Sequence, residues 1–220
     1  MNIRLVIFDF DGTMADTRQN IVRVMQMVMR QLELPVADEE TCASTIGLPL
    51  KDCFLHIYPE LSDAEGEHCA ETYRQLFFAN AKDFVPDLFP HVRETMELLH
   101  AKGIHMAIAS SRTSASLHGF VQEMNLSYLV DMVVGSDEVT AHKPDPEPVY
   151  AILKSLKFSA EETMVVGDMP VDILMGAAAG THTCAVTYGN ASVESLKACG
   201  SEFVIQDMAE LPCIINEKNS

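Results

Sequence analysis

The sequence predicts an α/β fold in which a Rossmann-like parallel sheet forms the core and a small all-helical segment is inserted after the first strand. Short apolar runs rich in β-branched residues alternate with amphipathic helical patterns over most of the 220 residues. Residues 16–82 break this alternation, because they carry helical patterns and no convincing strand. Hydrophobic residues make up 48% of the chain and charged residues 21%, which is ample material for a packed core.

The expected strands are short apolar segments. The first, residues 3–8, is rich in β-branched residues and is typical of a strand buried on both faces in the middle of a parallel sheet. We expect right-handed crossovers to join this strand to its neighbours in a mostly parallel sheet. The other expected strands are residues 104–109, 132–134, 163–166, 182–186 and 203–205.

The clearest helical pattern of the core begins at Pro90, which suits a first turn, and ends before Gly103, which suits the exit. Val92, Met96 and Leu99 share one face of this expected helix. A capping-box sequence at residues 159–162 predicts a further helix of only about one turn.

The helical insertion predicts two domains. Residues 1–15 and 83–220 should form the α/β core, and residues 16–82 should form the inserted helical cap. A capping-box sequence at residues 62–65 begins one helix of this insertion. Another helix is predicted by apolar residues that fall on one face: Ile21, Val24, Met25, Val28 and Leu32.

Charge and cysteine content exclude several classes of protein. The net charge of −17 argues against a nucleic-acid or anionic-membrane partner, so a local cation or a metal must attract any anionic substrate. The six cysteines are scattered without a CxxC pair and are expected to be reduced thiols. The apolar run near the start is too short for a signal peptide, and no later run is long enough to span a membrane, so we expect a cytoplasmic protein.

Acidic residues follow the first expected strand in the sequence DFDGT, residues 9–13. Ligands bind at the carboxyl ends of strands in open α/β sheets. Asp9 and Asp11 are two residues apart, so on an extended chain their carboxylates should face one spot, and Gly12 allows a sharp turn there. A hard divalent cation with oxygen ligands would relieve their repulsion. The alternative is an ordinary strand end followed by a solvated turn.

A second acid pair, Asp168 and Asp172, follows the expected strand 163–166, where Pro170 is expected to begin a helix. These residues place two more carboxylates at a strand end. The alternative is that Asp168 serves only as the helix N-cap.

A hydroxyl pair and a lysine complete the candidate set. Ser110 and Ser111 end the strand 104–109, where hydroxyl and backbone N–H groups can hold phosphate oxygens. Lys143 opens a KPDPEP segment whose prolines keep the chain extended and stiff, so its charge can offset the acids and an incoming phosphate. The alternative for Lys143 is an exposed loop residue.

Together these motifs resemble those of the haloacid dehalogenase-like (HAD) superfamily across nearly the whole chain. The helical insertion looks like the small C1-type cap of that superfamily. The four signature motifs are matched, in order, by residues 9–13, by Ser110, by Lys143, and by the pair Asp168 and Asp172.

The resemblance implies a phosphatase with an aspartyl-phosphate intermediate. Asp9 would be the nucleophile, and Asp11 would protonate the leaving alcohol and then deprotonate the hydrolytic water. Ser110 and Lys143 would position the phosphoryl oxygens as further catalytic residues, and Gly12 and Ser111 would belong to the same phosphate-binding set.

The resemblance also implies Mg²⁺ as the cofactor. Asp9, the backbone carbonyl of Asp11, and Asp168 would hold the ion, and Asp172 would support it indirectly or through water. The implied partner is a small phosphorylated metabolite, bound by a monomer or a homodimer.

Departures from relatives narrow the activity. Dehalogenases of the superfamily lack the second aspartate of the first motif, which is Asp11 here, so the sequence argues against dehalogenation. The similar β-phosphoglucomutases carry a histidine in the first cap helix where this chain has Ile21, which favours hydrolysis. A sugar-phosphate phosphatase or a mutase of this type stays an alternative.

Among phosphatases, the chain is most similar to phosphoglycolate phosphatases, with the related inorganic pyrophosphatases as an alternative. The segments that carry this similarity are residues 45–49, expected to be a cap loop facing the active site, and residues 143–149 and 186–189. Lys51 follows the first of these segments and either meets a second anionic group of the substrate or, as we favour, is an ordinary surface lysine.

Two readings without catalysis also remain. Receiver-like phospho-acceptor modules combine similar residues, but they carry the acceptor in a later strand, are much shorter and have no helical insertion. A protein that binds phosphate compounds without turnover is the other reading, and the complete set of Asp9, Asp11, Lys143 and Asp168 argues against it.

Overall fold

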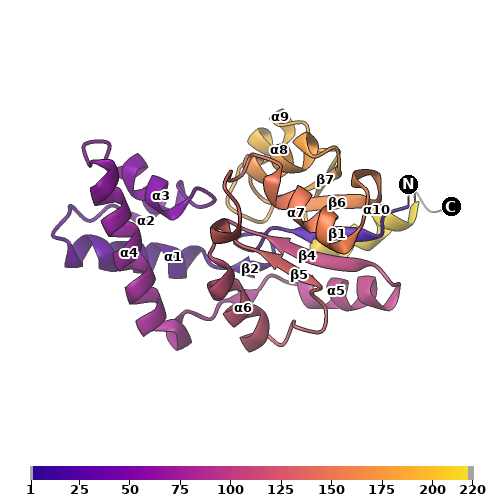
Figure 1. Cartoon of the computed structure of the whole chain (residues 1–220), viewed down its shortest axis with the longest axis horizontal. Helices are drawn as coiled ribbons and strands as arrows, with labels where there is room; N and C mark the ends of the chain where they lie inside the picture. The colour runs from indigo at the N-terminus through magenta and orange to yellow at the C-terminus, as the bar shows by residue number, and fades with distance from the viewer. Residues whose placement is uncertain (1, 218–220) are drawn as a thin grey trace. The chain divides into compact units, whose positions relative to one another are not determined.

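The computed structural model describes the backbone of residues 2–217, and their side chains except those of residues 81, 82, 216 and 217. The chain divides into two compact units, one made of Met1–Asp16 and Leu88–Ser220 and the other of Thr17–Asp87 (Figure 1). The first unit is the α/β core. The expectation that the second unit acts as a cap stays a prediction.

A parallel sheet of six strands forms the centre of the α/β unit, and each expected strand is present in it. The spatial order places the first strand between two later ones, so its end lies at the middle of the sheet. In that order the strands are β5 (Met132–Val134), β4 (His105–Ala109), β1 (Leu5–Phe8), β6 (Thr163–Gly167), β7 (His182–Val186) and β8 (Phe203–Ile205).

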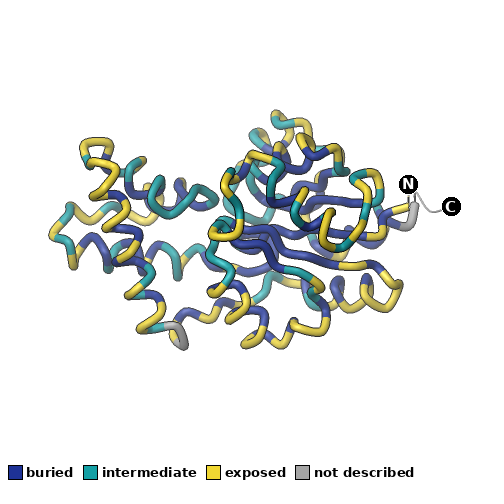
Figure 2. The backbone as a smooth tube through the Cα atoms, in the orientation of Figure 1, coloured by how far each residue is buried: buried dark blue, intermediate teal, exposed yellow. Residues whose placement is uncertain are grey.

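Strand β1 is buried along its whole length, as its continuous apolar sequence predicts (Figure 2). Ile7 is in register with Ala107 of β4 and with Val165 of β6. These side chains belong to a core cluster that also contains Val149 and Met175, from the helices on one face of the sheet. The parallel α/β architecture is therefore confirmed.

Helices cover both faces of this sheet (Figure 1). On one side lie α7 and α8, and on the other α5, α6 and α10, with α9 beside α8. Their bounds are α5 (Val92–Ala101), α6 (Ser114–Glu123), α7 (Glu147–Leu156), α8 (Pro170–Ala178), α9 (Val193–Ala198) and α10 (Leu211–Glu217). Short 3₁₀ turns are η2 (Ser136–Glu138), η3 (Ala160–Glu162) and η4 (Met208–Glu210), and η3 is the single turn that its capping box predicts.

The start of α5 differs from the prediction. The helix begins at Val92, not at Pro90, because His91 has left-handed backbone angles, with φ at 62°. Its imidazole Nδ1 lies 2.8 Å from the carboxylate of Asp207. At the other end the prediction is confirmed, since Gly103 takes a φ of 74° just beyond the C-cap residue Lys102.

The second unit is helical, as expected for the insertion. Ser62 begins α4 with the predicted capping box, in which its backbone N–H and hydroxyl both donate to Glu65. Within α1 the predicted face is confirmed by buried Val24, Met25 and Val28. The helices are α1 (Arg18–Gln31), α2 (Glu39–Ala43), α3 (Leu50–Ile57), α4 (Asp63–Ala79) and the 3₁₀ turn η1 (Ala81–Phe84).

Two very short strands, β2 (Ala15–Asp16) and β3 (Asp87–Leu88), form a separate two-stranded sheet where the chain leaves and re-enters the α/β unit. The sequence predicts no strand in residues 16–82, and none at residues 15–16 or 87–88. A strand of two residues is too short to carry a period of alternation, so the sequence could not show it.

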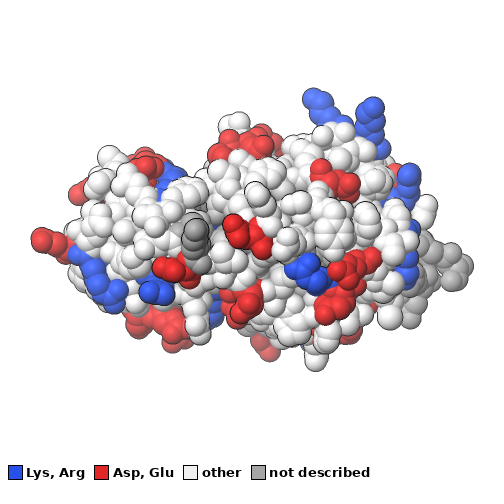
Figure 3. All heavy atoms as spheres, turned by 90° about the horizontal axis from the view of Figure 1, so that it is seen from below, with Lys and Arg blue, Asp and Glu red and all other residues white. Residues whose placement is uncertain are grey.

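The surface is acidic. The face drawn in Figure 3 carries several separate groups of acidic side chains, with basic ones among them. All six cysteines are free thiols, and most of them are buried. None of the helices within residues 2–217 is both long and apolar enough to cross a membrane.

Candidate active site

Asp9 lies directly beyond β1, and its side chain is 9% exposed. Its backbone N–H donates to the carbonyl of Val166 at 2.9 Å, which extends the pairing of β1 with β6 by one residue. The position of Asp9 is therefore fixed by the middle of the sheet, at the strand ends where ligands bind in this class of fold.

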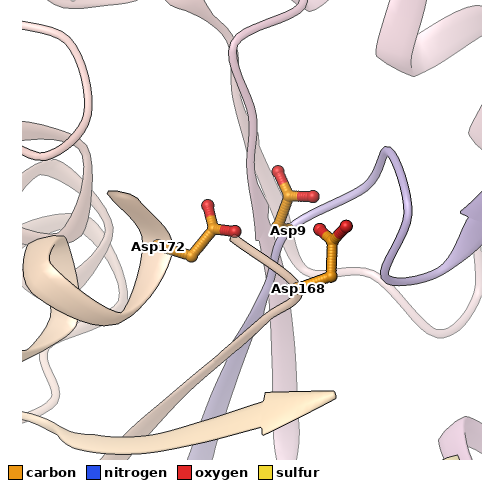
Figure 4. Close-up of side chains that lie close together, drawn as sticks. All are labelled: Asp9, Asp168 and Asp172. Atoms are coloured by element: carbon orange, nitrogen blue, oxygen red, sulfur yellow. The ribbon is translucent and has the colours of Figure 1, made fainter. Parts of the chain in front are cut away.

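Three carboxylates meet at this point, those of Asp9, Asp168 and Asp172 (Figure 4). Asp168 follows β6, and Asp172 comes from the first turn of α8. One oxygen from each lies within 4.8 Å of the others, and all three residues are buried. The neighbouring parallel strands β1 and β6 thus bring together two motifs that are far apart in the sequence, as predicted.

Glycines allow this close approach of backbone and acid. Gly12 has a φ of 88°, and a Cβ atom there would lie 2.2 Å from Oδ2 of Asp168. A Cβ atom on Gly167 would lie 2.2 Å from Cβ of Asp172. Both positions therefore require glycine, one for the turn after β1 and one for the packing of α8 against the end of β6.

Lys143 supplies a positive charge inside the acid cluster. Its Nζ donates to Oδ1 of Asp9 at 2.7 Å and to Oδ1 of Asp172 at 2.6 Å. The Lys143 side chain is only 4% exposed, so the alternative of an exposed loop lysine is wrong. A buried ammonium with two carboxylate partners is a paired charge, which is the condition under which burial is tolerated.

Burial and mutual repulsion shift the pKa values of this cluster. Burial raises the pKa of Asp9 well above its usual range, although the Lys143 ammonium opposes the shift. Burial, together with the nearby Asp172 carboxylate, raises the pKa of Asp168 to about 7. Burial alone would lower the pKa of Lys143, but the carboxylates of Asp172 and Asp9 outweigh it and raise that pKa. The cluster therefore holds more negative charge than its single lysine can offset.

Asp168 does not cap α8, so that alternative is wrong. Its carboxylate accepts from the hydroxyl of Thr13 at 3.1 Å, and from the backbone N–H and side-chain amide of Asn190 at 2.6 and 3.0 Å. Instead, Oδ2 of Asp172 accepts from the N–H of Met169 at the start of α8. The helix begins at Pro170, as predicted.

Asn190 is a site residue that sequence reasoning missed. It lies in the loop after β7, and that strand is the neighbour of β6 in the sheet. The only sequence signal was the position of Asn190 shortly after an apolar strand, which many loop residues share.

Asp11 is not one of the three clustered acids. Its carboxylate is paired with a different cation, and the expectation that Asp9 and Asp11 face one spot stays a prediction. Nε of Arg112 lies 2.8 Å from Oδ1 and 2.7 Å from Oδ2 of Asp11. Sequence reasoning missed Arg112, although it stands two residues beyond Ser110 in the loop after β4.

Ser110 and Ser111 follow β4, the strand on the other side of β1. Ser110 is buried, its N–H donates to the carbonyl of Val134, and its hydroxyl accepts from the N–H of Arg112 at 3.2 Å. Ser111 is half-buried. Both serines are therefore at the same edge of the sheet as Asp9, where the sequence places them.

The donor set fits a hard divalent cation. Asp9, Asp168 and Asp172 offer carboxylate oxygens, which are the ligands that Mg²⁺ prefers, and the one ammonium group of Lys143 does not balance their charge. The thiols and imidazoles that a zinc site would use are absent from this cluster of described residues. Asp9 and Asp168 would hold the ion, together with the Asp11 carbonyl, and Asp172 would support it.

The helical unit carries the other candidate residues. Residues 45–49 form a turn between α2 and α3, and their role in substrate choice stays a prediction. Nζ of Lys51 lies 2.6 Å from Oδ1 of exposed Asp63, an ion pair of the kind expected for an ordinary surface lysine. Ile21 is half-buried on α1.

The sequence is similar to those of known phosphatases. The sequence is 33% identical over 209 residues to "Probable phosphatase IndB" of Dickeya dadantii, covering 94% of this chain and 91% of that protein. It is 29% identical to the pyrophosphatase PpaX of Oceanobacillus iheyensis, covering 99% of both chains. It is 28% identical to the phosphoglycolate phosphatase of Salmonella paratyphi A, covering 86% of this chain and 82% of that protein.

The fold is similar to solved structures as well. The crystal structure of a haloacid dehalogenase-like hydrolase from Bacteroides fragilis superposes with a TM-score of 0.90 at 27% identity, covering 96% of this chain and all of that one. The family model of the haloacid dehalogenase-like hydrolases matches residues 6–186, a segment that contains every residue of the candidate site except Asn190 in the loop after β7. The chain therefore belongs to the haloacid dehalogenase-like hydrolase family.

Proposed function

We propose that this chain is a Mg²⁺-dependent phosphatase that hydrolyses small phosphate monoesters through a phosphate ester of Asp9. The observation that carries the proposal is the buried contact between Lys143 and Asp9, 2.7 Å long, within a cluster of three carboxylates. A lone buried acid would be neutral and a poor nucleophile. A carboxylate next to an ammonium group and a divalent cation stays ionised and can accept a phosphoryl group beside it.

Each step of the proposed reaction can be assigned to residues of the chain. The Asp9 carboxylate attacks phosphorus, and the bond from phosphorus to the alcohol oxygen breaks while Asp11 donates a proton to that oxygen. Asp11 then removes a proton from water, and the water oxygen attacks the phosphorus of the aspartyl-phosphate. Asp9 is regenerated as a carboxylate, and inorganic phosphate leaves.

The phosphoryl group is held by the chain and by the metal. Lys143 and Ser110, with Ser111 and the turn at Gly12, are placed at the strand ends where they can position the phosphoryl oxygens. Mg²⁺, when bound, would supply Lewis-acid neutralisation of the phosphoryl charge.

Phosphoglycolate is the first substrate candidate. The similarity to the phosphoglycolate phosphatase of Salmonella paratyphi A supports this choice, and the similarity to PpaX over 99% of both chains makes pyrophosphate the second candidate. Substrate choice within a shared fold depends on a few side chains, so identities of 28–29% favour the class of reaction more strongly than the substrate.

The test is a screen of phosphate release by the purified protein. Phosphoglycolate, pyrophosphate, sugar phosphates, nucleotides and p-nitrophenyl phosphate would be compared with Mg²⁺, with Ca²⁺ and with excess chelator. We expect phosphate release with Mg²⁺, loss of activity with chelator, and inhibition by Ca²⁺, whose looser coordination disturbs the attack. Full activity in excess chelator would rule out the proposed mechanism.

A further arm separates a phosphatase from a mutase. Incubation with β-glucose 1-phosphate, a trace of the bisphosphate and Mg²⁺ should release phosphate and form no glucose 6-phosphate. Ile21 stands where the mutases carry a histidine, so the chain lacks that group for holding a sugar bisphosphate in a second orientation. Formation of glucose 6-phosphate faster than phosphate would contradict the assignment.

A further inference from the structure

Arg112 pairs with Asp11 but belongs to none of the four sequence motifs. Nε of Arg112 lies 2.8 and 2.7 Å from the two carboxylate oxygens of Asp11. The two side chains are only 11% and 12% exposed, so water screens this ion pair far less than the surface pairs of the molecule. Both residues belong to the α/β unit.

Arg112 is itself fixed by its surroundings. Its guanidinium carbon lies 5.1 Å from the centre of the Phe120 ring, a cation–π distance. Phe120 in turn stacks on Phe10, with ring centres 5.5 Å apart and planes 8° from parallel. Phe10 stands between Asp9 and Asp11 in the chain. The Phe120 ring therefore packs against the turn after β1 and also against the guanidinium of Arg112.

A second contact ties Arg112 to the strand ends. Its backbone N–H donates to the hydroxyl of Ser110, which lies directly beyond β4. The guanidinium therefore has a defined place relative to β1 and β4. A carboxylate that pairs with it takes one orientation instead of rotating freely.

The ion pair with Arg112 also distinguishes Asp11 from the three clustered acids of the site. Three carboxylates surround the expected metal position, and those of Asp9 and Asp172 share the single ammonium of Lys143, so a fourth carboxylate there would add repulsion. Arg112 provides Asp11 with a separate cation. The geometry thus keeps the proposed acid–base group available for proton transfer and apart from the ligand cluster.

We infer that Arg112 is the positioning residue for Asp11, orienting its carboxylate toward the leaving-group oxygen, and that it acts through Asp11 instead of on the phosphoryl group. This inference rests on the proposed function, in which Asp11 donates the proton to the leaving alcohol. It extends the site by a residue outside the four motifs and by the ring pair that supports it.

The inference predicts a dependence on the leaving group. An alkyl alkoxide leaves only with a proton, whereas p-nitrophenolate leaves readily without one. Arg112→Ala should therefore slow single-turnover release of the alcohol from glycerol 2-phosphate roughly 10- to 100-fold more than release of p-nitrophenol, with little change in KM. Arg112→Met, which keeps the volume of the side chain, is the second variant in case the alanine variant does not fold.

A double-mutant cycle gives the decisive readout. In the Asp11→Asn background no acid remains to be positioned, so Arg112→Ala should change release of the alcohol from glycerol 2-phosphate less than about twofold. Arg93→Ala is the matched control, because Arg93 lies in the same unit and donates to the backbone carbonyl of Met124 at 2.5 Å. This control should leave both rates as they are in the wild type.

Each contrary result has its own meaning. Equal loss on both esters, or an undiminished effect of Arg112→Ala in the Asp11→Asn background, would overturn the positioning role and leave the proposed function standing. A wild-type protein that releases phosphate from neither ester overturns the proposed function, and the inference with it.

Discussion

At the scale of single residues, the candidate site contains two ion-paired sets, one buried and one partly buried. Lys143 contacts Asp9 and Asp172, and Arg112 contacts Asp11. Buried charges are stable only when they are paired and hydrogen-bonded, so removing one partner should be felt by all the others in the same set. Chemistry and local stability are therefore linked at these positions.

Asp9→Asn tests the nucleophile. The amide keeps the shape of the side chain but removes the charged attacking oxygen and a proposed metal ligand. We expect kcat against p-nitrophenyl phosphate to fall at least about 10³-fold with the fold intact. The matched control is Asp63→Asn on the helical unit, which breaks only the exposed pair with Lys51. Near-normal turnover by the Asp9 variant would remove this residue from its role.

Asn190→Ala tests the support of the proposed metal ligand. Two donors of Asn190 hold Oδ2 of Asp168, and the variant removes the side-chain donor. Loss of such a partner weakens metal binding by about 10–100-fold, so the Mg²⁺ concentration for half-maximal activity should rise by that factor while kcat at saturating Mg²⁺ changes less. Asn20→Ala, in α1, serves as the control. An unchanged Mg²⁺ requirement would show that the Asn190 side chain does not support the ligand.

At the scale of secondary-structure elements, the junction between β6 and α8 is a closely packed part of the site. Gly167 ends β6, and Asp172 reaches back from the first turn of α8 to the N–H of Met169. No side chain fits between the strand end and the helix, because a Cβ on Gly167 would lie 2.2 Å from Cβ of Asp172. Backbone and ligand positions are thereby fixed together.

Gly167→Ala should therefore displace α8 and the two carboxylates beside it. We expect loss of most activity and a lower free energy of unfolding, measured by urea denaturation. Gly119→Ala is the matched control, since a Cβ there meets no atom within 4 Å in the middle of α6. The control should stabilise the protein by about 0.5–1 kcal/mol and keep full activity. A fully active Gly167→Ala variant would contradict this packing argument.

The elements were predictable where the signal is local. Strand β1 is a continuous apolar run, and the capping box of α4 consists of two residues only three positions apart, Ser62 and Glu65. The positions of the strand and of the helix start could therefore be derived from the sequence alone. The contacts of Arg112 and Asn190 could not, because each depends on which strands become neighbours in the sheet. The predicted start of α5 is wrong for a different reason, because a histidine does not by itself predict the left-handed backbone found at His91.

At the scale of the whole molecule, we expect the stability of the fold to depend on its acidity and on the proposed metal. The chain carries a net charge of −17, and its most buried carboxylates are gathered at one edge of the sheet. Without a cation this arrangement opposes folding, and a bound cation stabilises the folded state by mass action. The α/β unit should therefore be more stable with Mg²⁺ than without it.

The pH dependence of the metal-free protein tests this coupling. The pKa of Asp168 is raised from 3.8 to about 7 by burial and by Asp172, so between these values the unfolded chain binds fewer protons at this residue than the folded chain. The free energy of unfolding should then fall as pH rises from about 4 to about 7, and Mg²⁺ should stabilise the protein more at about pH 7.5 than at about pH 5.

Urea denaturation of wild type and Asp168→Asn in chelator, at both pH values, measures the effect. The variant carries no titrating group at this position, so its stability should exceed that of the wild type more at the higher pH. A difference between the two proteins that is the same at both pH values would contradict the coupling.

The proposed covalent intermediate is the central claim, and trapping it is the most direct test. The protein would be mixed with ³²P-labelled phosphoglycolate and Mg²⁺, quenched in acid within one turnover, and mapped by peptide mass spectrometry. We predict acid-stable, hydroxylamine-sensitive label on the peptide that contains Asp9, and none in the Asp9→Asn variant. Phosphate release at the full rate without label on Asp9, or label on another residue such as Ser110, would contradict the mechanism.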